Sequence, residues 1–286
     1  MRKQVIHMVQ KIREDHPTMG VRDIYFKLRP AGLGRDAFEV ICQQEGLLSA
    51  PVRNWTRTTN SSGVIRFPDL TKDLGINKIN QVWQSDITYF ELQGRFYYLT
   101  FIQDIHTKMI VGHSCSSSLE TKQTTLPSLQ KAIKRRGIDL SGLILHSDGG
   151  GQYYCSEFLK LTQRHNILNS MCEYAWENGT VERLNGVIKN NYLKHRKIST
   201  YDELRKEVDR SVTLYNYDKP HKALKRKTPN MFEMEILSLQ QQPRPMMTES
   251  FNANLQSSWA SSPMTIEATK TSESRCIPRN IGWGGL

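Results

Sequence analysis

Three acidic residues have the types and spacing that a metal-dependent phosphoryl-transfer site requires. Asp86 lies in a run of strand-forming residues, Asp148 ends a short apolar run, and Glu182 falls near the start of a helical pattern. Cutting a phosphodiester requires a nucleophilic oxygen and neutralisation of charge on the phosphate and the departing oxygen. Two Mg²⁺ ions about 4 Å apart meet both needs. Because Mg²⁺ prefers carboxylate oxygen and water, a few acidic side chains on rigid elements suffice.

Each of these acids taken alone is weak support for such a site. An Asp within a strand is unusual but can be structural, and an acidic residue early in a helix favours the helix dipole. Asp104, after the second predicted strand, is a competing acid that we interpret as structural. Only the joint order of strand, strand end and helix indicates a shared site.

The elements that must position these acids follow from the apolar spacing. Period-two patterns and short apolar runs predict strands at 82–90, 96–102, 109–113, 143–145 and 167–168. Helical spacing predicts helices at 121–136, 154–165, 180–194 and 201–217. Three meandering strands followed by alternating helices and strands predict an α/β fold with a mixed sheet and flanking helices, which is the order of a ribonuclease-H-like fold. Ligands bind at strand ends in open α/β sheets, which suits Asp148.

The remaining regions differ in composition. The apolar spacing in residues 1–48 predicts three short helices with a Gly-containing turn. These helices form either a small helix-turn-helix-like DNA-binding domain or an ordinary helical bundle without DNA contact. Residues 49–79 are polar and interrupted, which indicates a linker. Residues 80–236 form the predicted catalytic core with basic C-terminal helices. Residues 237–286, rich in Gln, Pro and Ser, predict a disordered tail.

Positive charge is concentrated just after Glu182. The chain has a formal net charge of +11, and residues 183–227 hold 13 basic and 5 acidic side chains. We interpret this surplus as a contact surface for DNA phosphates; the alternative is a solvated basic surface. The candidates in this segment are Lys189, Lys194, Arg196, Lys197, Lys222, Lys225, Arg226 and Lys227. In the N-terminal helices the candidates that could face a groove are Arg22, Lys27 and Arg35.

Composition also excludes several classes of protein. No run approaches the roughly 18 apolar residues of a membrane helix, and the N-terminus lacks the apolar segment of a secretory signal. We therefore expect no membrane partner and a cytoplasmic location. The five cysteines are scattered without a C-x-x-C pair, so they predict reduced thiols rather than disulfides. His7, His16 and Cys42 do not form a zinc site.

Several separated motifs strengthen the interpretation of the three acids. In chain order they are Trp83-x-x-Asp86-Ile87-Thr88-Tyr89, His146-Ser147-Asp148-x-Gly150-x-Gln152-Tyr153, Asn178-x-x-x-Glu182, Tyr215-Asn216-x-x-x-Pro220-His221 and Thr228-Pro229-x-x-Phe232. Together they resemble the signatures of bacterial insertion-sequence DDE transposases with a retroviral-integrase-like catalytic core. The resemblance covers about residues 80–233, and residues 20–48 resemble that family's helix-turn-helix segment more loosely.

The resemblance implies a ribonuclease-H-like fold with Asp86, Asp148 and Glu182 as catalytic metal ligands. It implies two Mg²⁺ ions, with Mn²⁺ as a substitute, and double-stranded DNA as substrate, both transposon terminal repeats and target. It further implies a bacterial, nucleoid-associated enzyme that forms a homo-oligomer on DNA. Whether the product of an upstream reading frame is fused to or associated with this chain stays open.

The chain departs from the family pattern in two places. The interval from Asp148 to Glu182 is 34 residues, shorter than the commonest spacing, and Gly149-Gly150-Gly151 is richer in glycine than usual. Two functions other than that of a transposase remain as alternatives. One is a ribonuclease-H-like nuclease without strand transfer. The other is a catalytically inactive DNA-binding protein derived from a transposase.

Overall fold

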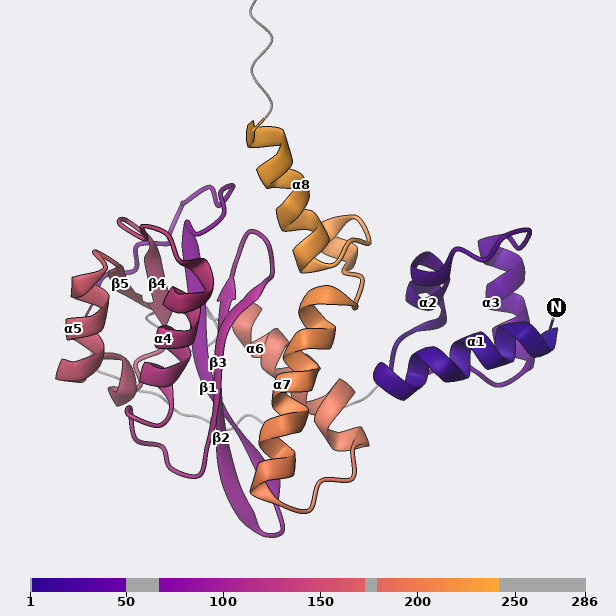
Figure 1. The fold of residues 1–286 in the computed structure, drawn as a ribbon, viewed down its shortest axis with the longest axis horizontal. Coiled ribbons are helices and arrows are strands. Elements are labelled where there is room, and N and C mark those ends of the chain that lie inside the picture. The colour runs from indigo at the N-terminus through magenta and orange to yellow at the C-terminus, as the bar shows by residue number, and fades with distance from the viewer. Residues whose placement is uncertain (1, 50–66, 173–178, 242–286) are drawn as a thin grey trace, which may run out of the picture. The chain divides into compact units, whose positions relative to one another are not determined.

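The computed structural model describes residues 2–49, 67–172 and 179–241 (Figure 1). Most of the predicted linker and the tail after residue 241 lie outside these residues. Regular structure continues to Gln241, beyond the predicted start of the tail at residue 237. Within the described ranges, no helix is long and apolar enough to span a membrane.

The N-terminal region contains the three helices that the spacing predicts. They are α1 (Arg2–Asp15), α2 (Val21–Leu28) and α3 (Arg35–Gln44). One apolar side chain from each helix, Val9, Ile24 and Phe38, is fully buried in a shared core. This packing explains the helical period, because every third or fourth residue must face the same core.

A mixed five-stranded sheet forms the centre of the catalytic region, as predicted. Its strands are β1 (Val82–Leu92), β2 (Arg95–Asp104), β3 (Ile110–Ser116), β4 (Ile144–Ser147) and β5 (Leu168–Met171). The spatial order is β3-β2-β1-β4-β5. The first three strands form an antiparallel meander, whereas β4 runs parallel to β1 and β5 runs parallel to β4. This topology is that of the ribonuclease-H-like fold.

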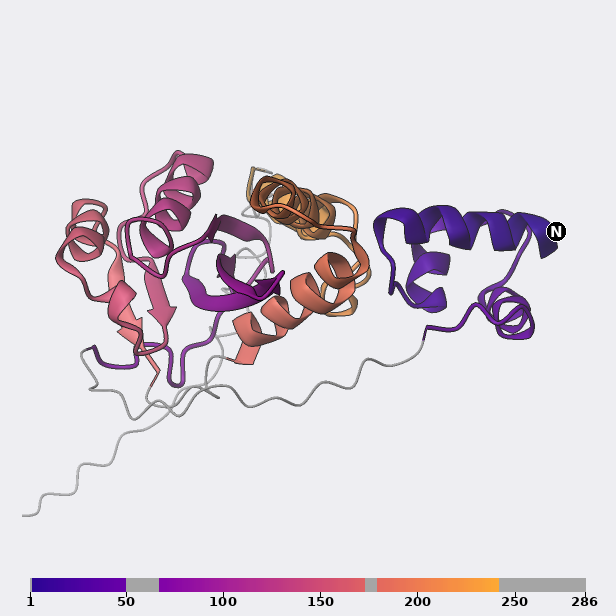
Figure 2. The same cartoon turned by 90° about the horizontal axis from the view of Figure 1, so that it is seen from below.

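Helices cover both faces of the sheet. They are α4 (Thr125–Arg136), α5 (Ser156–Arg164), α6 (Gly179–Gly186) and α7 (Tyr201–Tyr217), and α8 (Pro229–Gln241) follows and contacts α7. Figure 2 shows α4 and α5 on one side of the sheet and α6 and α7 on the other. Successive side chains of β1 point to opposite faces of the sheet, each of which has an apolar core. Trp83 is buried in the core with α4 and α5, whereas Phe90 packs against the core with α6. Asp86 shares the parity of Phe90, so it faces α6.

The helix that carries the third acid, Glu182, differs from the prediction. The predicted single helix over 180–194 begins as α6, widens into a π-helical segment at Val187–Tyr192 and ends in a 3-10 turn at Leu193–His195. Apolar spacing does not reveal these turns, because a single wider turn and a single tighter turn shift the helical period over too few residues to be recognised.

Helix α4 packs on β3 at Gly112, where a Cβ atom would lie 2.2 Å from the backbone oxygen of Ser128 and 2.9 Å from the Ala132 Cβ. We predict that Gly112→Ala lowers the free energy of unfolding by about 2 kcal/mol or more, because overpacking against backbone forces the helix to move. Urea denaturation measures the change. The control is Gly75→Ala, whose Cβ would meet nothing within 4 Å. Equal stability of the two variants would contradict this account of the packing.

Candidate active site

Asp86 occupies the point at which β1 becomes an open edge. Strand β4 pairs with β1 only from Val82 to Ser85, whereas β1 continues to Leu92. Among the described residues, Asp86 is therefore the first residue of β1 without a strand partner on that side, and it pairs with Phe101 of β2 on the other. A half-buried carboxylate at such an edge is held rigidly by one strand pair yet stays reachable from the other side.

Asp148 follows the end of β4, so the parallel pairing brings it beside the same edge. Its loop is anchored by Tyr153, whose hydroxyl hydrogen-bonds the Ser85 Oγ at 2.9 Å and whose ring packs edge-on against Phe158. Within the loop the Gly150 N–H donates to Asp148 Oδ1 at 3.2 Å. The loop therefore connects the second acid to the strand of the first through one buried tyrosine.

Glu182 lies in the first turn of α6 and is exposed. The helix is fixed by Val181 and Leu184, which are buried against β2. One turn after Glu182, the buried Asn185 donates its Nδ2 to Asp86 Oδ2 at 2.7 Å. This hydrogen bond joins the helix of the third acid to the carboxylate of the first. Asn185 was not among the predicted site residues, although its spacing of three from Glu182 places both residues on one helix face.

The three carboxylates repel one another. Burial, followed by the negative charges of Asp148 and Glu182, raises the pKa of Asp86 to about 7. Burial also raises the pKa of Asp148, against the opposing hydrogen bond from Gly150. Lys189, two turns after Glu182, adds a nearby positive charge that lowers the pKa of Asp86. The arrangement concentrates negative charge that a cation would neutralise.

The donor atoms fit a hard divalent cation. Asp86, Asp148 and Glu182 offer carboxylate oxygens, the ligands that Mg²⁺ prefers. The Asn185 Oδ1 and Gln84 Oε1 atoms are buried near Asp86 and accept no hydrogen bond in the described part of the chain, and unmatched buried oxygens are costly. No three acidic, His or Cys side chains among the described residues are close enough to enclose an ion as they stand.

Two residues near the acids have structural roles. Asp104 is fully buried and accepts backbone hydrogen bonds from Asn80 at 2.7 Å and Thr107 at 2.9 Å, so it shapes the β2–β3 turn as predicted. His146 is also buried and contacts Ser170 Oγ at 3.0 Å. Its Nδ1 also lies 3.7 Å from Asp69 Oδ1, and these contacts favour a structural role over a role in orienting Asp148.

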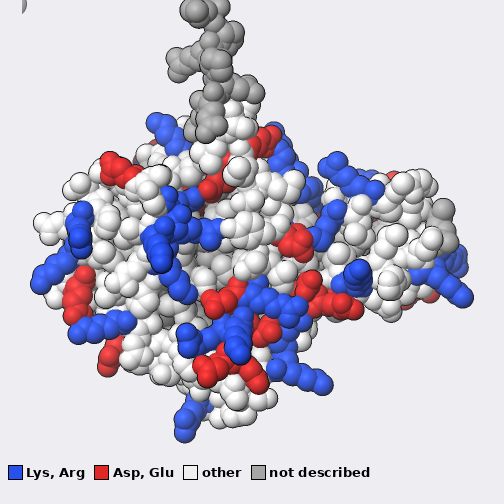
Figure 3. All heavy atoms as spheres, in the orientation of Figure 1, with Lys and Arg blue, Asp and Glu red and all other residues white. Residues whose placement is uncertain are grey.

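The candidate DNA-contacting residues differ in their contacts and exposure. Ion pairs to acidic side chains engage Arg22, Lys27, Arg35, Arg196, Arg226 and Lys227. Lys189 lies with its Nζ 5.2 Å from the centre of the Tyr89 ring. The exposed candidates are Arg22, Arg35, Lys194, Lys197, Lys222 and Lys225. Figure 3 shows that one face also gathers basic side chains over α4, whose last turn carries Lys134, Arg135 and Arg136.

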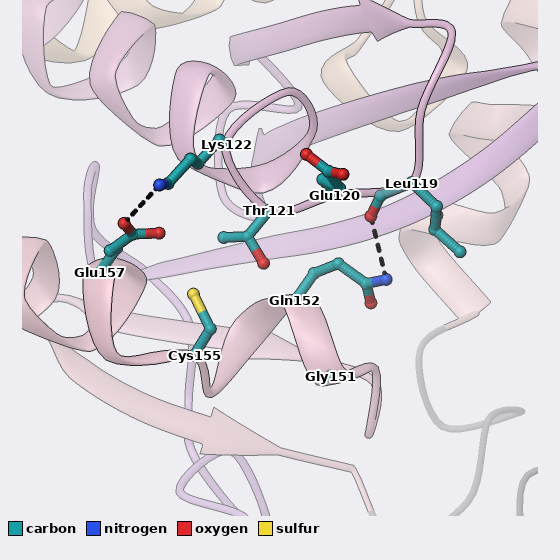
Figure 4. A pocket seen from close by; sticks show the side chains of 8 residues that line it. All are labelled: Leu119, Glu120, Thr121, Lys122, Gly151, Gln152, Cys155 and Glu157. Atoms are coloured by element: carbon teal, nitrogen blue, oxygen red, sulfur yellow. Dashed lines mark hydrogen bonds and ion pairs between the residues drawn. The ribbon is translucent and has the colours of Figure 1, made fainter.

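A shallow pocket of about 390 Å³ adjoins the Asp148 loop (Figure 4). The Gln152 Nε2 donates to the Leu119 carbonyl at 3.1 Å, and an ion pair of 3.0 Å joins Lys122 to Glu157. These contacts tie the loop to the segment before α4. The pocket therefore supports the position of the loop, and we assign it no ligand.

Comparisons with known proteins match the region of the chain that contains the three acids. Two family models, both described as integrase core domain, match residues 77–175 and 165–229, which together span more than half of the chain. The "uncharacterized 31 kDa protein" of insertion element IS600 from Shigella sonnei is 28% identical over 75% of this chain and 81% of its own length. The transposase for insertion sequence element IS629 from Shigella sonnei is 29% identical over 64% of this chain and 62% of its own.

Two solved structures are similar in fold. The HTLV-2 integrase catalytic core domain, in complex with magnesium, is 20% identical with a TM-score of 0.43 and covers 54% of this chain and 96% of its own. The match in the simian T-cell lymphotropic virus intasome is 18% identical with a TM-score of 0.47 and covers 93% of this chain and 80% of its own.

The raised pKa of Asp86 predicts a pH-dependent stability. Between about pH 4 and 7 the unfolded chain releases this proton while the folded, metal-free chain keeps it, so stability falls as pH rises. Asp86→Asn removes this loss of stability, because asparagine does not ionise. We predict that it stabilises the metal-free protein by about 2–4 kcal/mol at pH 8, at about 1.4 kcal/mol per pKa unit, and changes little at pH 4.

Urea unfolding at both pH values, in the presence of a chelator, measures this difference. Asp73→Asn is the control, because Asp73 is exposed and asparagine tolerates its positive φ of 60°. A stability gain from Asp86→Asn that is the same at pH 4 and pH 8 would show that repulsion among the acids is not its cause.

Proposed function

We propose that this chain, which belongs to the insertion-sequence transposases with an integrase core domain, cleaves the ends of its element and joins the DNA 3′ ends to target DNA. The observation that supports the proposal is that the negative charges of Asp148 and Glu182 raise the pKa of Asp86, which lies just beyond the pairing of β1 with β4. An edge site suits a long duplex substrate, because the scissile phosphate can reach it without entering an enclosed cavity.

The proposed reaction has two steps of one kind. In the first, a water oxygen attacks phosphorus and the cleaved strand leaves with a 3′ hydroxyl. In the second, that hydroxyl oxygen attacks a phosphate of the target and displaces the 3′ oxygen of the target strand. One phosphodiester bond breaks as another forms in the second step, so joining needs no separate energy source.

The residues have distinct proposed roles. Asp86, Asp148 and Glu182 hold two Mg²⁺ ions, or Mn²⁺ in their place, which when bound activate the attacking oxygen and neutralise the departing one. Asn185 fixes the orientation of Asp86 through its hydrogen bond. Tyr153 positions the Asp148 loop through Ser85. Lys189, which carries positive charge beside Asp86, contacts the phosphate of the bound strand.

The proposed partners follow from the same substrate. The chain binds double-stranded DNA, both terminal repeats and target, as a homo-oligomer assembled on that DNA in the bacterial cytoplasm. The exposed lysines after Glu182 contact phosphates, and the helices around Arg22, Lys27 and Arg35 supply sequence preference. A strand-transfer assay distinguishes this function from the two alternatives, a nuclease without strand transfer and an inactive DNA-binding protein.

Removing any one of the three acids should abolish both reactions. We predict that Asp86→Asn, Asp148→Asn and Glu182→Gln each reduce cleavage and joining about a thousandfold or more, because a lost ligand removes several kcal/mol of transition-state stabilisation. DNA binding should stay within about threefold of wild type, since each change removes negative rather than positive charge. The measurement is strand transfer with terminal-repeat duplexes and Mg²⁺ or Mn²⁺.

The matched controls are Asp73→Asn and Glu14→Gln, which change exposed acids and should leave activity intact. Near-normal strand transfer by Glu182→Gln would remove it from the site. Testing Glu177→Gln in parallel examines the acid nearest in sequence, which lies outside the described residues. Cleavage without joining by the wild type would identify a nuclease, and neither reaction would identify an inactive DNA-binding protein.

The basic segment should account for part of the salt dependence of DNA binding. Lys197, Lys222 and Lys225 are exposed, and none of the three has an ion pair within the described ranges. We predict that changing all three to Gln flattens the slope of log affinity against log salt by up to about 3, one per lost phosphate contact, on every DNA sequence alike.

A salt titration of DNA binding on terminal-repeat and random duplexes provides the measurement. The matched control changes Lys78, Lys160 and Lys206 to Gln; these lysines are also exposed. If both triple variants shift the slope equally, the effect is one of net charge rather than of contact. If only the preference for the terminal repeat is lost, the segment reads sequence and its proposed role is wrong.

A further inference from the structure

Two exposed aromatic side chains lie together on the β1–β2 hairpin, close to the candidate active site. Tyr89 is 40% exposed and Phe96 is 51% exposed. Their ring centres are 5.3 Å apart, and their planes are nearly perpendicular at 85°. Among the residues that the structure describes, the other exposed Tyr, Phe or Trp is Tyr217 on α7. Single exposed apolar residues are common on proteins, whereas adjoining ones mark surfaces that bind a partner.

The register of the hairpin explains why both rings are exposed. Tyr89 lies opposite Tyr98, and Phe96 lies opposite Glu91, so Tyr89 and Phe96 are diagonal neighbours on one face of the sheet. Nearer the start of β1, α4 and α5 cover this same face, and Ile87 packs against their apolar core. The two rings therefore lie on the part of the hairpin that extends past this core.

Lys189 links the aromatic pair to the carboxylates. Its Nζ lies 5.2 Å from the centre of the Tyr89 ring, and its positive charge acts on Asp86. Asp86 and Tyr89 point to opposite faces of β1, because they are three residues apart. Lys189 reaches both because β4 pairs with β1 only as far as Ser85, which leaves this edge of the strand open. The ammonium group therefore lies at the edge, between the acids and the rings.

The charges around the pair favour a nucleic acid over an apolar protein surface as its partner. Lys189 has no ion pair to an acidic side chain within the described ranges, so a ligand phosphate could bind it. Glu91, opposite Phe96, is negative and favours that phosphate on the Lys189 side only. A nucleotide offers a flat base to the rings and a phosphate to the lysine. An apolar protein surface would bury the ammonium group without an anion, which is costly.

We propose that Tyr89 and Phe96 form a stacking site for one unpaired base of the DNA substrate, and that Lys189 binds the phosphate beside that base. The proposal rests on the proposed function for its ligand. Neighbouring bases cover both faces of a base in a duplex, so the bound base must leave the stack to contact the rings.

The position of the rings limits which base this is. Asp86 and Tyr89 are separated by three residues of one strand, which is about 10 Å at about 3.3 Å per residue. At about 3.4 Å per nucleotide along each strand of a duplex, the unpaired base lies within about three nucleotides of the scissile phosphate. Stacking there would hold the DNA open next to the reacting bond. It would also tolerate any sequence, because every base has an aromatic face.

The test measures binding of the full-length protein to two random-sequence duplexes that differ only in whether the base pairs at one end are mismatched. We expect the wild type to bind the mismatched duplex more tightly. Phe96→Leu keeps an apolar side chain but removes the ring. It should weaken binding to the mismatched duplex about five- to a hundredfold and leave binding to the paired duplex unchanged. The salt slope should also stay unchanged, because stacking releases no counterions.

Three further variants make the comparison specific. Tyr217→Leu is the matched control, because it removes an exposed ring from the end of α7, and it should leave both affinities unchanged. Phe96→Tyr keeps a ring and should keep the preference for the mismatched duplex. Tyr89→Leu should reproduce the loss seen with Phe96→Leu, and it decides the question if Phe96→Leu melts well below the wild type.

Several results would overturn the stacking site. They are equal binding of both duplexes by the wild type, an equal loss on both duplexes in Phe96→Leu, or loss of the preference in Tyr217→Leu. A flatter salt slope in Phe96→Leu would also overturn it, since the ring would then act through a phosphate contact. Self-association of the wild type that Phe96→Leu abolishes would identify a second copy as the occupant. Absence of strand transfer with the preference intact would refute the proposed function and leave the stacking site standing.

Discussion

The rest of the structure depends on one electrostatic constraint, which is that three mutually repelling carboxylates must be held together before a cation arrives. Their repulsion and burial raise the pKa of Asp86 to about 7. Local structure alone could not hold them, because they are distant in sequence and lie on three elements. The apolar cores on the two faces of the sheet oppose the repulsion, since separating the acids would require moving β1 or α6 out of well-packed positions.

The fold solves this constraint with differences in strand length and helix position. Strand β4 ends at Ser147, whereas β1 continues beyond Ser85, its partner there. Asp86 and Asp148, the next residue of each chain segment, therefore lie beside each other at an edge that a DNA phosphate can approach. Helix α6 contributes Glu182 and is joined to Asp86 by the hydrogen bond that Asn185 donates. The positive charge of Lys189 acts on Asp86, so the protein places a cation beside the acids, where a phosphate group of DNA would lie.

Much of this arrangement could be predicted from sequence, because its signals are local. The helix Tyr201–Tyr217 matches its prediction, and Thr200 and Glu203 form a capping box that marks its start. Strand alternation likewise predicted the sheet. What the sequence could not supply were contacts without a local period. The hydrogen bond between Asn185 and Asp86 spans 99 residues, and no spacing rule connects a strand to a helix so far along the chain.

The central claim is that Asp86, Asp148 and Glu182 bind divalent cations together. The most direct measurement is anomalous diffraction from crystals soaked in Mn²⁺ at a pH above 7, where Asp86 is ionised. The account predicts anomalous peaks about 2.0–2.3 Å from carboxylate oxygens of Asp86 and Asp148, with Glu182 contributing a ligand to one of them. Ordered Mn²⁺ elsewhere on the protein, with none at these carboxylates, would contradict it.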